Sequence, residues 1–234
     1  MNKFITSLCQ DFISLFYPSV CAACNRLLMR HETVICSFCN IELPKTFYHT
    51  IKNNPLEEVF WGRIKIEAAA ARYFFRKKGK VQHLMHNFKY KGKQEIGVFI
   101  GEEYGKELIT NPIFQSVDVI IPIPLHIKKK KIRGYNQSEM FAIGLSKSMN
   151  ATVDVTTLIR SIATSTQTRK NRFMRWENVK EIFQVTDLKA LENKHILLVD
   201  DIITTGATIE GAAQMLMQIN GIKISVAGIA CTTI

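Results

Sequence analysis

Two adjacent carboxylates and a threonine-rich turn stand together in the run HILLVDDIITTGATIEGAAQML, residues 195–216. The run begins like a buried strand, which we expect to end at Val199. Asp200 and Asp201 would then follow at the carboxyl edge of the sheet, where open α/β sheets bind ligands. The two carboxylates are hydrogen-bond acceptors, suited to the two hydroxyls of a ribose or to the water shell of a metal ion.

The turn that follows the carboxylates opens a helix and has the chemistry of a phosphate site. Backbone N–H groups and hydroxyls gathered at a helix N-terminus would come from Thr204, Thr205, Gly206, Ala207 and Thr208. Gly206 permits a positive φ or a close approach that a side chain would obstruct. Such a turn alone is also an ordinary helix cap, and an aspartate pair can merely solvate a strand end. The combination of strand, carboxylates and turn favours the phosphate site.

A second polar run, VDVIIPIPLHIKKKKIRGYNQSE at residues 117–139, follows another expected strand. Pro122 and Pro124 would give a stiff turn at the strand edge. The lysines at 128–131 and Arg133 could meet a pyrophosphate, and Arg133 could do so through two hydrogen bonds. Taken alone, the four lysines fit a solvated loop or a nucleic-acid contact equally well.

Four of the six cysteines form two Cys-x-x-Cys pairs with eleven residues between them: Cys21, Cys24, Cys36 and Cys39. Two such knuckles can complete a tetrahedral four-thiolate shell, which favours zinc. Because four thiolates leave no open position for water, the zinc would be structural. Two disulfides or four unrelated thiols are the competing interpretations, and His31 is a weak alternative ligand.

Residues 76–93, RKKGKVQHLMHNFKYKGK, carry seven Lys or Arg and no acidic residue. Cations interleaved with aromatic rings suit single-stranded nucleic acid, because the cations follow phosphates and the rings stack on bases. The alternative is a solvated helix face whose Phe88 packs in the core. The sequence leaves both open.

These residues need a scaffold, and the hydrophobic pattern predicts one. Short β-branched runs alternate with helical stretches, which predicts an α/β fold with a parallel sheet covered on both faces. We expect strands within residues 66–75 and at 117–121, 153–159, 195–199 and 222–229, and helices at 81–90, 95–110, 136–148 and 207–220. Polar residues 44–55 are typical of a linker. We therefore expect two parts: an amphipathic helix with a four-cysteine zinc module in residues 1–50, and an α/β domain in residues 60–234.

Composition bounds the remaining possibilities. The chain has 234 residues, 47% of them hydrophobic, and a net charge of +11, which fits either an anionic partner (a nucleotide, nucleic acid or anionic lipid) or plain solubility. It has no apolar run of 18 residues, which argues against a membrane-spanning segment. The N-terminus fits a signal peptide poorly, and paired cysteines without an export signal favour the cytoplasm.

Taken in order, the motifs resemble the ComF (GntX-like) family of type I phosphoribosyltransferase-like proteins, several of which take part in DNA uptake during natural transformation. The resemblance runs over nearly the whole chain. It is carried by the four cysteines, the Lys89-Tyr90-Lys91-Gly92 segment, Pro122-Ile123-Pro124-Leu125, Arg133-Gly134-Tyr135-Asn136-Gln137, Gln167-Thr168, Arg175-Trp176-Glu177-Asn178-Val179 and the stretch from Asp200 to Thr208. Lys170 departs from the family pattern, in which we expect an apolar residue.

The resemblance implies a type I phosphoribosyltransferase fold that binds 5-phosphoribosyl-1-pyrophosphate (PRPP). Asp200 and Asp201 would face the ribose hydroxyls, residues 204–208 the 5-phosphate, and residues 122–137 the pyrophosphate with Mg²⁺. Residues 161–180 would be a flexible loop that closes over the leaving group, where basic residues neutralise developing charge. The implied catalytic residues are Asp200, Asp201, Arg133 and Arg175, and further ligand-binding residues are Pro122, Pro124, Gly134, Asn136, Gln137, Gln167 and Asn178.

Three functions remain open on the sequence. An enzyme would transfer the phosphoribosyl group to a base or amine and release pyrophosphate. A DNA-handling protein would bind single strands, use PRPP as ligand or regulator, and work with competence proteins such as a DNA helicase. A sensor would respond to PRPP alone. We favour DNA handling with retained PRPP binding.

Overall fold

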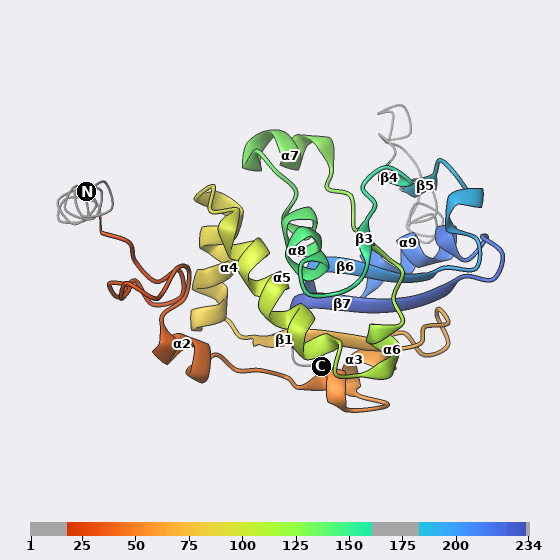
Figure 1. Cartoon of the computed structure of the whole chain (residues 1–234). Helices are drawn as coiled ribbons and strands as arrows, with labels where there is room; N and C mark the ends of the chain where they lie inside the picture. Colours follow the sequence, from red (N-terminus) through yellow and green to blue (C-terminus); the bar gives the residue numbers. More distant parts are fainter. Residues whose placement is uncertain (1–17, 161–182, 233–234) are drawn as a thin grey trace, which may run out of the picture.

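A central parallel sheet organises the molecule, as a computed structural model shows for residues 18–160 and 183–232 (Figure 1). Its strands lie in the order β1-β7-β6-β2-β3. They are β1 (Ala69–Phe75), β7 (Lys223–Thr232), β6 (His195–Ile203), β2 (Val119–Pro122) and β3 (Thr152–Val153), and all neighbours pair in parallel. This confirms the predicted fold class.

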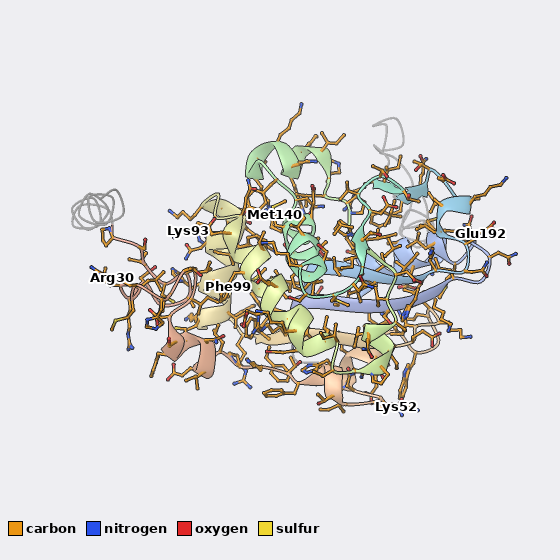
Figure 2. The ribbon with its side chains drawn as sticks, viewed as in Figure 1. Arg30, Lys52, Lys93, Phe99, Met140 and Glu192 are labelled. Atoms are coloured by element: carbon orange, nitrogen blue, oxygen red, sulfur yellow. The ribbon has the colours of Figure 1, made fainter. Side chains whose placement is uncertain are left out.

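Alternate residues of the strands face opposite sides of the sheet, and both sides are buried. Leu197 and Val199 of β6 face one core, whereas Ile196 and Leu198 face the other. Buried parallel strands therefore read as continuous apolar runs. Figure 2 shows side chains filling the space between the sheet and its helices.

Helices cover both faces of the sheet. The first core takes apolar residues from α4 (Lys80–Tyr90), α5 (Glu95–Leu108) and α8 (Gln137–Ser146), and the second takes them from α3 (Pro55–Glu58) and α9 (Ala207–Leu216). In α5 every fourth residue from Ile96 to Leu108 is buried, as the helical period requires. The other helical segments of the described residues are short: α2 (Ser37–Glu42), the 3₁₀ turns Tyr48–Thr50 and Lys189–Leu191, α6 (Pro112–Gln115) and α7 (Ile127–Arg133).

Two predicted elements differ from the structure. The strand expected at 153–159 is divided into β3 and β4 (Leu158–Arg160), because the carboxylate of Asp154 accepts from the N–H groups of Thr156 and Thr157 and turns the chain. The lysine-rich segment, expected as a turn or loop, forms α7. His126 caps this helix through Nδ1, which accepts from the N–H of Lys128 at 3.2 Å.

Residues 44–55, whose polar composition predicts a linker, lie along β1. The N–H of Thr46 donates to the carbonyl of Arg72 at 3.0 Å, and the amide of Asn54 donates to the carbonyl of Ala69 at 2.9 Å. This segment thus bonds to the backbone of the sheet and is packed against the fold.

The four cysteines lie at one end of the molecule, opposite Glu192. Figure 2 shows Arg30, which is next to them in the chain, at the far end from Glu192. The amphipathic helix expected near the N-terminus falls within residues 1–17, outside the described residues. Among the helices that the structure describes, none combines the length and apolar character needed to cross a bilayer.

Candidate functional site

The predicted site lies at the carboxyl edge of the sheet, but the strand that carries it is longer than expected. β6 continues through Asp200 and Asp201 to Ile203, so the prediction that it ends at Val199 is wrong. Pairing with β2 stops at Val199, whereas β7 accompanies β6 as far as Ile203. The two aspartates, hereafter the acidic pair, therefore stand on a strand whose β2 side has become open.

Asp200 is held by hydrogen bonds in a largely buried position. The hydroxyl of Ser138 on α8 donates to its Oδ1 at 3.0 Å, and the N–H of Asp201 donates to the same oxygen at 2.8 Å. Burial, together with the neighbouring charge of Asp201, raises the pKa of Asp200 to about 7, against the lowering effect of these bonds and of Lys89. Asp200 is thus poised to exchange a proton near neutral pH.

Asp201 is paired with Lys89, which lies in the last turn of α4. The Nζ of Lys89 is 2.9 Å from Oδ2 of Asp201 and 3.0 Å from its Oδ1, and both side chains are largely buried. Charge-assisted bonds of this kind are stronger than neutral ones. Arg160, at the end of β4, also faces the acidic pair: burial lowers the pKa of its guanidinium, and the charge of Asp200 opposes that shift.

The predicted phosphate loop, residues 204–208, lies between β6 and α9. Gly206 has a φ of +72° and stands at the N-cap of α9 without a side-chain cap, so no cap occupies the first helical N–H groups. The Thr and Ala side chains of the loop are exposed. A Cβ on Gly206 would lie 2.7 Å from the ring of Phe60, so glycine is required by both conformation and packing.

The same loop is held from behind by Arg63, which follows α3. Its guanidinium donates to the carbonyl of Thr205 at 2.8 Å and forms an ion pair with Glu210 in the first turn of α9. Arg63 therefore ties the loop to the first turn of α9.

The segment predicted to bind pyrophosphate begins at the end of β2. Pro122 is buried as the last residue of β2, and Pro124 is half-buried. Asn136 caps α8 and donates to the carbonyl of Ile123 at 3.0 Å, which fixes this segment against the strand end. Gly134, with a φ of +80°, ends α7 and redirects the chain toward Asn136.

Arg133 and Gln137 contact each other in this segment. The guanidinium of Arg133 donates to Oε1 of Gln137 at 2.8 Å and lies over the ring of Tyr90 at 5.6 Å from its centroid. The four lysines of α7 are exposed. In Figure 1 α7 stands on the outer side of α8.

Three predicted site residues fall outside the described residues: Gln167, Arg175 and Asn178, together with the loop expected at 161–180. The strands next to this region are described. β4 pairs antiparallel with β5 (Phe183–Val185), with Arg160 opposite Phe183.

The four cysteines come together as predicted. Their sulfur atoms all lie within 4.8 Å of one another, and Sγ of Cys24 is 3.7 Å from Sγ of Cys36. All four are free thiols, which excludes the two-disulfide alternative in this structure. A tetrahedron with Zn–S bonds of about 2.3 Å has edges of about 3.8 Å. The cluster thus has the size of a four-thiolate metal shell.

The surroundings of the thiols also suit a metal. Burial would raise the pKa of Cys21, but N–H groups from Cys36, Ala23 and Cys24 lower it to about 7. Such N–H donors stabilise thiolates, the form that binds metal. Burial raises the pKa of Cys39 far above that of an ordinary thiol, as expected for a group that needs a cation nearby to ionise. His31 is exposed and outside the cluster.

Comparison with known proteins agrees with this geometry. The family described as phosphoribosyl transferase domain matches residues 135–233. The chain is 27% identical over 215 residues to the DNA utilization protein YhgH of Shigella flexneri, covering 90% of this chain and 89% of the relative. It is 30% identical over 115 residues to Competence protein F of Haemophilus influenzae (48% and 50% covered) and 25% identical over 202 residues to Competence protein ComFC of Bacillus subtilis (85% and 78% covered). These matches support a ComF-family, phosphoribosyltransferase-like protein.

Several close neighbours of the site are not marked by the domain match or by a motif. Lys89 and Arg63 precede the matched residues, whereas Ser138 and Arg160 lie within them without a motif of their own. Lys89 belongs to a motif that the sequence does reveal, Lys-Tyr-Lys-Gly, but nothing in that motif indicates contact with Asp201. Arg63, Ser138 and Arg160 are single polar residues with no sequence signal that would have selected them.

A cavity of about 540 Å³ lies away from these residues, near the amino-terminal end of β1. Tyr48, Trp61, Glu67 and Phe114 are among its lining residues, and none of the predicted site residues lines it. The chemistry of the ComF-family motifs is therefore at the opposite edge of the sheet from this cavity.

Proposed function

We propose that this ComF-family protein binds PRPP with Mg²⁺ at the carboxyl edge of β6 and β2, and handles single-stranded DNA during DNA uptake in the cytoplasm. The observation that carries the proposal is the outward-facing phosphate loop placed directly after the acidic pair. The N–H groups at the start of α9 would bind the 5-phosphate, because an anion is favoured at a helix N-terminus. Asp200 and Asp201 would accept hydrogen bonds from the ribose hydroxyls.

The pyrophosphate would lie toward residues 122–137. Arg133, already oriented by Gln137, would contribute charge there. Mg²⁺ would arrive with the pyrophosphate, whose oxygens are the hard ligands that this cation prefers. Zinc in the cysteine cluster would be structural, since four thiolates fill its coordination sphere.

The test is calorimetric titration of the full-length protein with PRPP, with and without Mg²⁺. We expect saturable Mg²⁺-dependent binding that is lost in Asp200→Asn with Asp201→Asn. Asp187→Asn is the matched control, since Asp187 is an exposed carboxylate that caps the turn at Lys189. Absence of binding by the wild-type protein would refute the proposed ligand.

DNA handling is supported by exposed positive charge before and after α4, whose last turn reaches the acidic pair. Within residues 76–93, Lys80 and Lys89 form ion pairs, and the other five cations form none with any described residue. Phe88 is fully buried and unavailable for base stacking, whereas Tyr90 is 59% exposed. The exposed rings of the segment are therefore Tyr90, next to Arg133, and His86, whose ring centroid is 5.1 Å from that of Tyr90.

Salt dependence tests the DNA proposal. Affinity for a single-stranded oligonucleotide should fall with added salt, with a slope of about 0.7 per phosphate neutralised. Replacing the four lysines of α7 by glutamine should reduce that slope, whereas replacing the exposed Lys106 of α5 and Lys147 at the end of α8 by glutamine should not. An affinity that does not change with salt would contradict a phosphate-binding surface.

The second candidate function is catalysis, in which the phosphoribosyl group of PRPP is transferred to an acceptor. Attack at C1 of the ribose would expel pyrophosphate through a cation-like centre, which ionised Asp200 and Asp201 would stabilise electrostatically. A screen of bases, amines and oligonucleotides for pyrophosphate release separates an enzyme from a protein that uses PRPP as a ligand alone.

A further inference from the structure

Helix α4 contacts both the region around the four cysteines and the acidic pair. One side contacts the residues around the cysteines, hereafter the cysteine module (residues 19–42), and its last turn reaches the acidic pair. The buried side of α4 lies in the same core cluster as Cys21, Cys36 and Cys39. In Figure 1 α4 stands between α2 and the helices over the sheet.

The contact with the cysteine module involves the first knuckle itself. The side-chain amide of Asn87, 8% exposed, donates to the carbonyl of Ala22 at 2.8 Å. Nδ1 of His83 lies 3.2 Å from the carbonyl of Ala23. These two carbonyls lie between Cys21 and Cys24, so the shape of the knuckle decides where they point.

The contact with the acidic pair comes two residues after Asn87. Lys89 extends from the last turn of α4 to Asp201. The carbonyl of the intervening Phe88 accepts a hydrogen bond from the buried hydroxyl of Tyr135, which fixes the end of the helix. Asn87 and Lys89 therefore share one rigid helical turn.

The beginning of α4 has one side-chain bond of its own, in which the N–H of Lys78 donates to the side-chain oxygen of Gln82. Its N-cap is Gly79, which makes no side-chain bond, and the first turn contains no acidic residue. Lys80 in that turn opposes the helix dipole, and its ion pair is with Glu42 of the cysteine module. The module thus contributes to holding α4 at both its beginning and its middle.

We propose that the cysteine module positions Lys89 over the acidic pair through Asn87, so that loss of metal from the module weakens ligand binding at Asp200 and Asp201. That PRPP is the ligand at the acidic pair rests on the function proposed above. Metal binding by a small cysteine module is coupled to its folding, so the carbonyl of Ala22 keeps its place only while the knuckle is formed. Asn87 is a positioning residue in this scheme.

The first test measures the Kd for PRPP with Mg²⁺ on the full-length, zinc-loaded chain and on the same protein after chelation, with metal content measured in parallel. Asn87→Ala should weaken binding at least about fivefold, within the usual range of coupling between sites. His86→Ala, next to Asn87 but exposed on the same helix, should stay within about twofold. Metal removal should weaken the wild type similarly and add little to Asn87→Ala. Equal affinities before and after metal loss would overturn the proposal.

A second readout separates positioning from general loss of structure. Asp200 is faced by Asp201 of its own strand, Lys89 of α4 and Arg160 of β4, with the neutral Ser138 from α8. Displacing Lys89 removes a positive charge, so in Asn87→Ala the pH profile of binding should move to higher pH, as in Lys89→Met. The double variant should show no further shift. Additive shifts would mean that Asn87 does not act through Lys89.

Hydrogen exchange without ligand tests the coupling independently of PRPP binding. Metal removal should speed amide exchange in residues 87–90 and 200–205, but not in residues 210–216 of α9. If the wild type binds no PRPP, the proposed function fails, and exchange alone decides the coupling. Unchanged exchange over residues 200–205 after metal loss would then refute it.

Discussion

The ammonium of Lys89 lies 2.9 Å from a carboxylate oxygen of Asp201, although 112 residues separate the two in sequence. This pair brings one positive charge to two adjacent carboxylates on β6. Like charges so close disfavour double ionisation, and the lysine offsets part of that repulsion. The charge state of the acidic pair is therefore set partly by α4.

Replacing Lys89 by methionine should raise the pKa of Asp200 above its value of about 7. The reason is that the charge of Lys89 favours the ionised form, whereas burial and Asp201 oppose it. Carboxyl carbon chemical shifts followed through a pH titration would measure the change. Lys93→Met is the control, since Lys93 forms no ion pair with any described residue. An unmoved Asp200 titration would show that Lys89 acts on Asp201 alone.

Asp200→Asn should stabilise the protein at pH 8. Because the folded-state pKa is raised, the folded protein holds a proton that the unfolded chain releases near pH 4. Stability from this group is complete below the unfolded pKa and is lost as pH rises through about 7. Each pKa unit corresponds to about 1.4 kcal/mol, so we expect a gain of about 1–3 kcal/mol at pH 8 that shrinks toward pH 4. Urea unfolding at several pH values would measure this gain. A stability difference between variant and wild type that does not change with pH would contradict a raised pKa for Asp200.

The sequence predicts the elements whose pattern is local. The spacing of Leu84 and Phe88 predicts α4, and the apolar run from His195 predicts β6. The length of β6 is not local, because residues beyond Val199 remain in the sheet only through β7, which lies further along the chain. Helix α7 depends on a cap by His126 and a positive φ at Gly134. The four consecutive lysines between them give no apolar periodicity from which a helix could be predicted.

The same distinction holds for the site. The acidic pair, the phosphate loop and the cysteines are short motifs, and each is recognisable in the sequence. Their partners Lys89 and Arg63 come from elsewhere in the chain, and Arg63 is 147 residues from Glu210. Such contacts arise only when the sheet brings distant segments together, so no spacing rule reveals them.

Cys21→Ser should release metal and destabilise the cysteine module. Three thiolates and a hydroxyl bind zinc less tightly, and the buried Cys21 also accepts from the N–H of Cys36 at 3.3 Å. Metal content and thermal unfolding would measure the loss. Cys231→Ser is a useful comparison, because Cys231 is buried in the sheet and outside the cluster. It should retain the metal, and equal metal loss in both variants would contradict the assignment.

Glu107→Ala should destabilise the fold by about 3 kcal/mol, the usual cost of leaving a buried charge without its partner. Glu107 pairs with Arg72 at 3.2 Å, and the Arg72 side chain is only 1% exposed. Glu103→Ala removes a carboxylate from the same helix, but its partner Lys106 is exposed, so its effect should stay below about 1 kcal/mol. Urea unfolding of both variants would measure the difference. Equal effects would mean that other groups stabilise the buried charge of Arg72 when Glu107 is absent.

Arg63→Ala should weaken PRPP binding about tenfold while changing overall stability little. The guanidinium of Arg63 donates to the carbonyl of Thr205 at 2.8 Å. That bond orients the peptide that leads into Gly206, and the orientation directs the first N–H groups of α9 toward the ligand. Calorimetric titration would measure the affinity, and urea unfolding the stability.

Glu210→Gln separates the two contacts of Arg63. It removes the ion pair with the guanidinium but leaves the bond to the carbonyl of Thr205 available. Because exposed ion pairs contribute little, its effect on PRPP affinity should be smaller than that of Arg63→Ala. If Glu210→Gln weakened binding as much, the ion pair at the start of α9, and not the carbonyl of Thr205, would be what holds the loop in place.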